Sequence, residues 1–313
     1  MTLTANKKIG RNLVKRAKEE VPGFEAMYYR FERSMSLLGR SKKTFESYGR
    51  HLAVISLHFG RTPLELEAEE VQEYLFELQR RARTPSLTYF KHTVFALRFL
   101  LKSEGLSYDY LALPEIKKEK KLPTVLSKEE VWAMLHSCKT LKHKMLIGLL
   151  YGCGLRCLEV RNVRLRDLDF DRKRLHVVQG KGKKDRYLPL SEHLIRGLKN
   201  YIATDHPVEW LFNGQPNDRE GGDFATQYAG RSIQGIVKEL AKRAGIAKDV
   251  HVHTLRHTFA THLLEDGLDI VNVKEMLGHV RIQTTMDYLH VARSNPLRAF
   301  SPLDTLFEQC SKK

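Results

Sequence analysis

Cysteine is scarce in this sequence. The 313-residue chain has only four cysteines, and none forms a C-x-x-C pair: Cys138, Cys153, Cys157 and Cys310. Disulfide frameworks are typical of small secreted domains, in which cysteines are dense. The cysteine pattern therefore excludes a disulfide scaffold as the basis of the fold. It fits a reducing compartment, and we expect a cytoplasmic protein.

Long hydrophobic runs are also missing. The most apolar stretch, Met145 to Leu155, is about half of the roughly 20 residues that a membrane-spanning helix requires. The N-terminus is basic, but the apolar segment of a signal peptide does not follow it. We therefore expect a soluble chain with no membrane partner.

Two common catalytic motifs do not occur. The sequence has neither a G-x-x-x-x-G-K-[ST] phosphate-binding loop nor an H-E-x-x-H zinc motif. Four histidines do lie close together in the sequence, namely His251, His253, His257 and His262. Because no cysteine or carboxylate stands beside them at ligand spacing, we expect no metal site. A metal-dependent nuclease built on these histidines stays an alternative.

Positive charge is what the sequence has in excess. There are 53 Lys and Arg residues against 37 Asp and Glu residues, a formal net charge of +16. A basic protein is attracted to a polyanion, because each neutralised phosphate releases condensed counterions. The charge favours nucleic acid as a partner, although a merely basic housekeeping protein would show the same count.

The first third of the chain shows helical periodicity. Residues 1–21 read as a basic arm, and residues 22–107 as a domain of four helices. The helices are expected from Phe24, after an N-cap at Ser41, from about Pro63 and from Pro85. The last of them carries Lys91 and Arg98 as candidate contacts to a DNA backbone. A helical adaptor domain would show the same pattern.

Residues 108–124 read as a linker. Leu113-Pro114 ends the helical pattern, and a charged run without apolar periodicity follows before Pro123. A connector between two domains lies near any duplex that they hold. Four lysines of this run are therefore candidate DNA contacts: Lys117, Lys118, Lys120 and Lys121.

Residues 125–291 predict a second domain with helices and one small sheet. Ser127 and Glu130 match a capping box, and an apolar helix from Leu141 ends at Gly152. Arg156 follows at the start of a short helix, where free N–H groups and the helix dipole favour an anion. Strands are expected at 168–170, 175–178 and 186–190, the last two around a lysine-rich turn. The fold class is mainly α with a small β-sheet (α+β).

The last third gathers histidine, arginine and tyrosine at short offsets. His253 and Arg256 are three residues apart in a helix starting near Thr254, so their side chains can point the same way. Gly278 is expected to end a later helix, with His279 just beyond it. A final helix carries Tyr288.

Five motifs in this order resemble the tyrosine recombinases, the phage integrase family: Tyr151-Gly152-Cys153-Gly154-Leu155-Arg156 with Glu159, Gly180-Lys181-Gly182, His253-Thr254-Leu255-Arg256-His257, Leu277-Gly278-His279, and Tyr288. The resemblance covers nearly the whole chain. It implies a core DNA-binding domain at 22–107 and a catalytic domain at 125–291. One mild departure is Leu158, where the family often has a smaller polar residue.

The resemblance also implies roles. Arg156 and Arg256 would grip the non-bridging oxygens of a DNA phosphate, with hydrogen bonds from His253 and His279. Lys181 would protonate the leaving 5′-hydroxyl, with Lys183 as the alternative donor, and Glu159 would orient a histidine or an arginine. Tyr288 would attack phosphorus and form a 3′-phosphotyrosine. Its ordinary pKa is near 10, so we expect the positive surroundings to favour attack at neutral pH. No metal, ATP or other cofactor is implied.

The family resemblance further implies a homotetramer on two DNA duplexes, with residues 292–313 as a tail that docks on a neighbouring protomer. Integration, excision and resolution stay open, as does an Xer-like, mobile-element or integron-related origin. A catalytically silent DNA-binding protein on the same scaffold is the main alternative.

Overall fold

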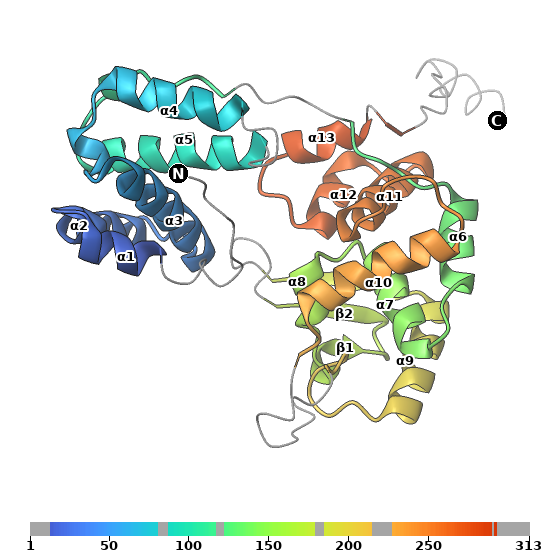
Figure 1. Ribbon diagram of the computed structural model, residues 1–313. Helices are drawn as coiled ribbons and strands as arrows, with labels where there is room; N and C mark the ends of the chain where they lie inside the picture. Colours follow the sequence, from blue (N-terminus) through green and yellow to red (C-terminus); the bar gives the residue numbers. More distant parts are fainter. Residues whose placement is uncertain are drawn as a thin grey trace, which may run out of the picture. The chain divides into compact units, whose positions relative to one another are not determined.

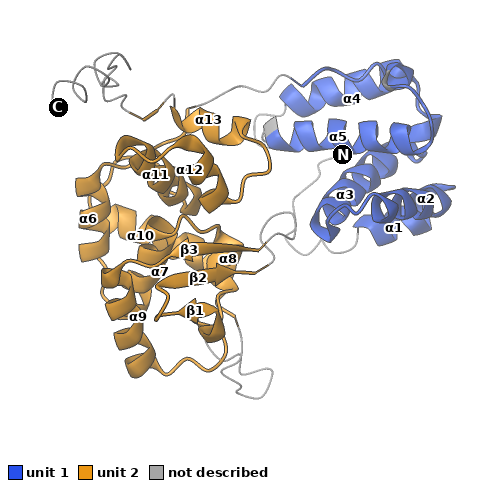
Figure 2. Cartoon of the chain, turned by 180° about the vertical axis from the view of Figure 1, so that it is seen from behind, with its two compact units in different colours: residues 1–119 blue, residues 120–313 orange. Residues whose placement is uncertain are grey.

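The computed structural model describes residues 13–80, 87–116, 122–178, 185–214, 227–289 and 291–292. The chain separates into two compact units, residues 1–119 and 120–313 (Figures 1 and 2). The division falls inside the expected linker. Several predicted features lie outside the described residues: the beginning of the arm, the end of the tail, and Lys117, Lys118, Lys120, Lys121, Lys181 and Lys183.

Helices form unit 1. In chain order they are α1 (Leu13–Glu20), α2 (Phe24–Leu37), α3 (Lys42–Phe59), the 3₁₀ turn η2 (Pro63–Glu65), α4 (Ala68–Arg80), α5 (Leu87–Ser103) and the 3₁₀ turn η3 (Tyr108–Leu111). Phe24, Phe31 and Leu52 are fully buried with Leu97 and Leu100 of α5 in one core. The apolar spacing that predicted these helices is thus the spacing of their buried faces.

Local sequence signals set the ends of α3. The Ser41 hydroxyl accepts a hydrogen bond from the backbone N–H of Thr44, which satisfies one of the free donors of the first turn. Beyond the last turn, the chain leaves the helix at Gly60. The predicted N-cap of this helix agrees with the structure.

The structure differs from the sequence reading at two places in unit 1. Residues 13–20 form α1, which packs on α3 and buries Ala17, so this part of the expected arm belongs to the helical core. Pro63 opens a 3₁₀ turn rather than a long helix, and α4 starts at Ala68. Thr62 and Glu65 close a capping box around that turn, which isolates it from α4.

Unit 2 contains the helices α6 to α13 and a sheet. The helices are α6 (Lys128–His136), α7 (Leu141–Gly152), α8 (Cys157–Arg161), α9 (Glu192–Asp205), α10 (Gly230–Arg243), α11 (Val252–Glu265), α12 (Ile270–Leu277) and α13 (Gln283–Leu289), with the 3₁₀ turn η4 (Leu165–Asp167). The strands are β1 (Leu168–Asp169), β2 (Arg174–Val177) and β3 (Arg186–Pro189).

The sheet is antiparallel in the order β1-β2-β3, and Leu175 pairs with Leu188 across β2 and β3. Both leucines are fully buried, so one face of the hairpin lies against the helices. The mainly helical fold class with one small sheet is confirmed.

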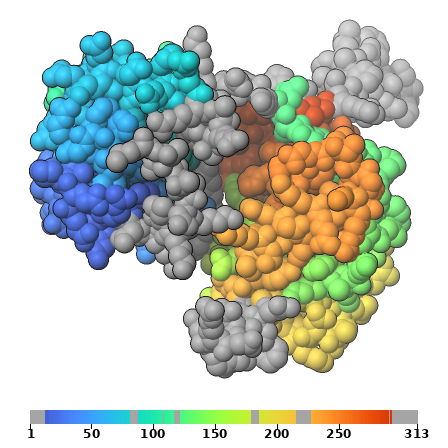
Figure 3. Space-filling model, viewed as in Figure 1, coloured from blue at the N-terminus to red at the C-terminus, as the bar shows by residue number. Residues whose placement is uncertain are grey.

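Helix α7 lies at the centre of unit 2. It packs against α9 and α11, and Leu146, Ile147 and Leu150 have no exposed surface. Helix α10 presents its polar side to solvent and occupies a large part of the face seen in Figure 3. In the described residues, no helix is long and apolar enough to cross a membrane. The core thus fixes α7 and α11, which carry or adjoin the site residues.

Candidate active site

The predicted site residues converge on one pocket in unit 2. Five of the six predicted catalytic residues line a cavity of about 400 Å³: Arg156, His253, Arg256, His279 and Tyr288. They come from the N-cap of α8, the first turns of α11, the second residue after the end of α12, and α13. Segments more than a hundred residues apart in the sequence therefore meet here. Lys181 lies outside the described residues.

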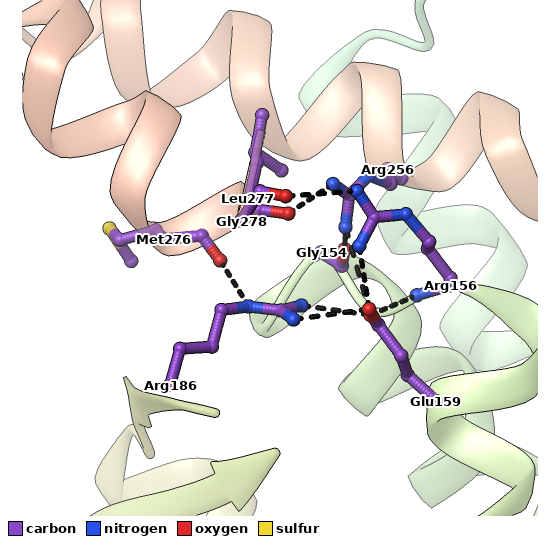
Figure 4. A network of polar contacts seen from close by, with 8 residues as sticks. All are labelled: Gly154, Arg156, Glu159, Arg186, Arg256, Met276, Leu277 and Gly278. Atoms are coloured by element: carbon purple, nitrogen blue, oxygen red, sulfur yellow. Dashed lines mark hydrogen bonds and ion pairs between the residues drawn. The ribbon is translucent and has the colours of Figure 1, made fainter. Parts of the chain in front are cut away.

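The Glu159 carboxylate holds the arginines of the pocket in place. Its carboxylate accepts hydrogen bonds from the Arg156 side chain at 2.6 Å and from the Arg156 backbone N–H at 2.9 Å (Figure 4). Arg256 Nη1 lies 3.8 Å from Glu159 Oε2, the oxygen that accepts from the Arg156 backbone N–H. The Glu159 side chain is only 6% exposed. The expected orienting role of Glu159 therefore has a geometric basis, and its partners are arginines.

Arg186 of β3 is part of this network, although the sequence reading did not single it out. Its two terminal nitrogens donate to the two Glu159 oxygens at 3.1 and 2.8 Å, a bidentate pair. The Arg186 side chain is 10% exposed. One sequence signal could have found it: Arg186 has the same strand parity as Leu188, so it faces inward.

The C-terminus of α12 receives one arginine at each of three successive carbonyl groups. Arg186 Nε donates to Met276 O at 2.8 Å, Arg256 Nη2 donates to Leu277 O at 2.5 Å, and Arg156 Nη2 donates to Gly278 O at 3.4 Å (Figure 4). The last carbonyls of a helix have no partner within the helix and form the negative end of its dipole. The three guanidinium groups satisfy them.

Two glycines permit this arrangement. Arg256 Nη1 reaches Gly154 O at 2.6 Å, and Gly154 has φ +58° with the Phe259 ring 2.3 Å from where a Cβ would stand. Gly278 has φ +61° and ends α12 as predicted. Any other residue at Gly154 would strain the backbone and displace Phe259.

Positive charge exceeds negative charge in the pocket. Burial raises the pKa of Glu159, but hydrogen bonds and the charges of Arg186 and Arg156 outweigh it and bring this pKa to about 2. Burial and the charge of Arg156 lower the pKa of Arg256 to about 9. An anion placed between Arg156 and Arg256 would offset their mutual repulsion, so the pocket is suited to a phosphate.

The histidines have separate surroundings. Burial, together with Arg256 and Arg156, lowers the pKa of His253, which lies on the exposed edge of α11. His279 Nδ1 lies 2.9 Å from the hydroxyl of Thr285, which is fully buried, so its ring orientation is fixed. Both rings line the pocket.

Tyr288 is buried in the structure. Its side chain belongs to a small apolar cluster with Phe259 and Leu277, and 3% of the residue is exposed. The hydroxyl lies 3.0 Å from His257 Nδ1. Burial raises the pKa of Tyr288 more than Arg256 and Arg156 lower it. The two arginines therefore act on the phenol in the expected direction, but desolvation outweighs them in the free protein.

The predicted DNA contacts on α5 are partly committed within unit 1. Arg98 is half-buried and donates to Pro114 O at 2.7 Å, and Lys91 is also half-buried.

In the part of the chain that the structure describes, no group of three or more His, Cys, Asp or Glu residues is arranged to hold a metal ion.

Comparison with known proteins identifies the family. Residues 124–295 match the phage integrase family. The chain is 34% identical over 281 residues to a putative integrase/recombinase, y4qK, of Sinorhizobium fredii, with 88% of each chain covered. It is 33% identical over 277 residues to a tyrosine recombinase of Thermosipho africanus, covering 84% of this chain and 94% of that one. The chain belongs to the phage integrase family.

A solved structure extends this result. The XerH site-specific recombinase, in a post-cleavage complex with its palindromic difH substrate, superposes with a TM-score of 0.65, covering 91% of this chain and 92% of that one. At 20% identity the likeness shows a shared fold. By family and relatives, the protein is a tyrosine recombinase, an enzyme that breaks and rejoins DNA.

Proposed function

We propose that this protein is a site-specific recombinase whose nucleophile is Tyr288, and that it cuts DNA through a covalent 3′-phosphotyrosine. The observation that carries the proposal is the meeting of Arg156, Arg256 and Tyr288 in one pocket with two histidines. The reaction needs a nucleophile, neutralisation of the phosphate and a proton for the leaving oxygen. Double-stranded DNA is the proposed partner, supported by the net charge of +16.

The side chains divide the work. Arg156 and Arg256 bind the non-bridging oxygens, and His253 and His279 add hydrogen bonds to the same phosphate. Lys181, or Lys183 two positions on, protonates the 5′-oxygen as it leaves. Glu159 holds the arginines in place. The tyrosyl ester keeps the energy of the broken bond, so rejoining to another strand needs neither ATP nor a metal ion.

Assembly completes the proposal. The reaction exchanges strands between two duplexes, so we propose a homotetramer on two DNA molecules in the cytoplasm. Residues 292–313 would link neighbouring protomers. Lys91, Arg98 and the lysines at 117, 118, 120 and 121 would contact the DNA backbone. Sedimentation of the protein with its selected duplex counts the protomers in the complex.

The silent DNA-binding alternative predicts binding without chemistry. It is disfavoured because the arginines, histidines and tyrosine of the motifs are all present and five of the six predicted catalytic residues line one cavity. A scaffold that only binds DNA has no need of a buried carboxylate that orders two arginines, such as Glu159.

The decisive experiment traps the covalent product. A pool of duplexes carries randomised flanks around one 5′-bridging phosphorothiolate, whose thiolate leaves without a general acid and rejoins poorly. We expect a protein–DNA adduct that survives denaturant, forms in EDTA, and carries the nucleotide on Tyr288 by mass spectrometry. Tyr288→Phe should form no detectable adduct. Tyr29→Phe, on the exposed face of α2, is the matched control and should react like wild type.

Three outcomes would overturn the proposal. An adduct with Tyr288→Phe would place the nucleophile elsewhere. Retention of the pool by wild type without any adduct would favour the silent DNA-binding protein. Cleavage that EDTA abolishes would favour the nuclease.

A further inference from the structure

We propose that His257 is an acid–base catalytic residue of this site. It would take the phenol proton from Tyr288 during strand cleavage and return it when the tyrosine leaves during rejoining. This inference deepens the proposed function and rests on it, since it takes Tyr288 as the nucleophile. The proposed function gives roles to the arginines, His253, His279 and Lys181, but it names no acceptor for the phenol proton of Tyr288. His257 would be that acceptor.

The contact between the two side chains is direct. His257 Nδ1 and the Tyr288 hydroxyl oxygen are 3.0 Å apart, within the reach that proton transfer requires. The ring centroids are 5.4 Å apart, and α11 packs on α13, so both helices hold the pair. Both residues line the cavity of the arginines. The phenol oxygen that would attack phosphorus therefore already bears a hydrogen bond to a base.

The position of His257 on α11 explains the geometry. His253, Arg256 and His257 fall within one helical turn, so their side chains leave the same region of the helix. Arg256 turns toward the carbonyls of Gly154 and Leu277, whereas His257 turns toward α13. Adjacent residues thus serve the phosphate and the nucleophile separately.

The charge states suit a base and its acid before reaction. Burial, with the charges of His253 and Arg256, lowers the pKa of His257 to about 4, so the imidazole is neutral near neutral pH. Burial keeps Tyr288 protonated. In the tautomer with hydrogen on Nε2, the unprotonated Nδ1 accepts the phenol proton. A neutral pair can remain buried until substrate arrives.

A bound phosphate would change this balance in the useful direction. Its negative charge favours the imidazolium form and raises the pKa of His257, and it partly offsets the positive charges that lower it. Among the described residues, the charged and titratable groups around the pair are His253 and Arg256 on α11, Arg156 at the start of α8, His279 and Arg281 after α12, and Asp287 on α13. Proton transfer would then be favoured only when DNA occupies the pocket.

The step balances in atoms and electrons. The phenol O–H bond breaks, an Nδ1–H bond forms, and the phenol oxygen bonds to phosphorus. The bond from phosphorus to the 5′-oxygen breaks, and its electron pair stays on that oxygen, which takes a proton from the lysine ammonium. Rejoining reverses each transfer, and the His257 imidazolium protonates the departing phenolate.

His279 is the competing candidate for this role. Its ring stacks near Tyr288 with centroids 6.2 Å apart, but its Nδ1 faces the hydroxyl of Thr285. The described ring contact of His253 is with His257, at 6.3 Å between the ring centroids. The hydrogen bond described for the Tyr288 hydroxyl pairs it with Nδ1 of His257, so the geometry points to His257.

The test replaces His257 by asparagine. His257→Asn keeps a polar atom near the position of Nδ1 but cannot carry the proton. We expect single-turnover cleavage to fall by roughly 10² to 10⁴-fold, the usual contribution of a general base, with DNA affinity unchanged. The substrate is the phosphorothiolate duplex selected with wild type. The thiolate leaving group of this substrate should rescue a variant that lacks Lys181, but it should not rescue His257→Asn.

The pH dependence of the cleavage rate distinguishes a proton-transfer role of His257 from a structural role. The wild-type rate should fall as the pH drops through the pKa of His257 in the DNA complex, because the base form is lost, and His257→Asn should lack this inflection. His251→Asn changes an exposed histidine at the N-cap of the same helix and should leave both rate and profile unchanged. A wild-type rate for His257→Asn, or a slower rate with the same profile, would overturn the proposal.

A measurement on the free protein keeps the inference independent of the DNA site. With carbon-13 at the tyrosine ring, the Tyr288 resonance should shift as His257 titrates, and the shift should vanish in His257→Asn. A Tyr288 signal that ignores the titration of His257 would overturn the pairing, even for a protein that forms adducts. Failure of Tyr288→Phe to abolish the adduct would instead refute the proposed function itself.

Discussion

The two sides of the pocket are held in different ways. On the arginine side, Arg156, Arg186 and Arg256 each donate both to a backbone carbonyl of α12 or the residue after it and toward the buried Glu159 carboxylate. On the tyrosine side, α13 has seven residues, and the hydrogen bond described for the Tyr288 hydroxyl goes to His257. One side is a charged network and the other a neutral pair.

The difference shows that the arginines can be preorganised for a phosphate while the tyrosine stays buried and protonated. The groups proposed to bind the phosphate are fixed before DNA arrives, so little reorganisation is needed to bind the anion. Tyr288, the proposed nucleophile, is buried and protonated, so it is inactive until the surroundings change. A change on binding is therefore expected at α13, and the arginine side should stay as it is.

Arg256→Lys should break the arginine side most strongly. Lysine presents a single charged nitrogen and cannot reach both Gly154 O and Leu277 O while binding a phosphate oxygen. We expect single-turnover cleavage to fall by roughly 10² to 10³-fold, as for loss of one oxyanion donor. Arg243→Lys, an exposed ion pair on α10, is the control and should react normally. A loss below tenfold would mean that Arg256 supplies charge without geometry.

Glu159→Gln should weaken the same side by removing its negative charge. The folded-state pKa of Glu159 is about 2, below its ordinary value of 4.5, so the carboxylate contributes stability above pH 4.5 that is lost as the pH falls toward 2. The shift corresponds to about 3 kcal/mol at neutral pH. Urea unfolding at pH 7 should show a loss of this order in the variant.

The pH dependence provides the internal control for Glu159. Between pH 5 and 2, the difference in unfolding free energy between wild type and Glu159→Gln should shrink, because the wild-type carboxylate becomes protonated. Other carboxylates titrate equally in both proteins and cancel. A difference that stays constant over this range would show that packing, and not charge, explains the loss.

Thr285→Val should have the smallest effect and lies on the tyrosine side. Valine has nearly the same shape, but it removes the hydroxyl that fixes His279 Nδ1 at 2.9 Å. The loss of one hydrogen bond, about 1 kcal/mol, predicts a cleavage rate lower by roughly fivefold. Thr204→Val, exposed on α9, is the control. A loss as large as that of Arg256→Lys would show that the tyrosine side is as rigidly organised as the other.

Local signals in the sequence predicted much of the fold. The capping box of Ser127 and Glu130 starts α6, and Gly278 ends α12 in the left-handed conformation. Such features depend on a few neighbouring residues, so one sequence suffices to find them. The wrong helix start at Pro63 has a local cause too, since Thr62 and Glu65 close a separate turn.

Long-range contacts were harder to foresee. The partners of Glu159 include Arg186 of β3, 27 positions along the chain, and no local pattern states that the two meet. The pKa of Tyr288 depends on the balance between burial and charge, which the sequence does not give. The burial of Ala17 similarly requires α3, so residues 13–20 looked like an arm.

The length of α12 also fixes the positions of the site residues that follow it. Its three successive carbonyls receive Arg186, Arg256 and Arg156, and the chain that leaves it carries the histidine and tyrosine of the pocket. Adding or removing one residue inside this helix would turn everything beyond it by about 100°. The three arginine contacts and the position of Tyr288 in the pocket would then be lost together. We therefore expect α12 to tolerate substitutions on its exposed face but no change in length.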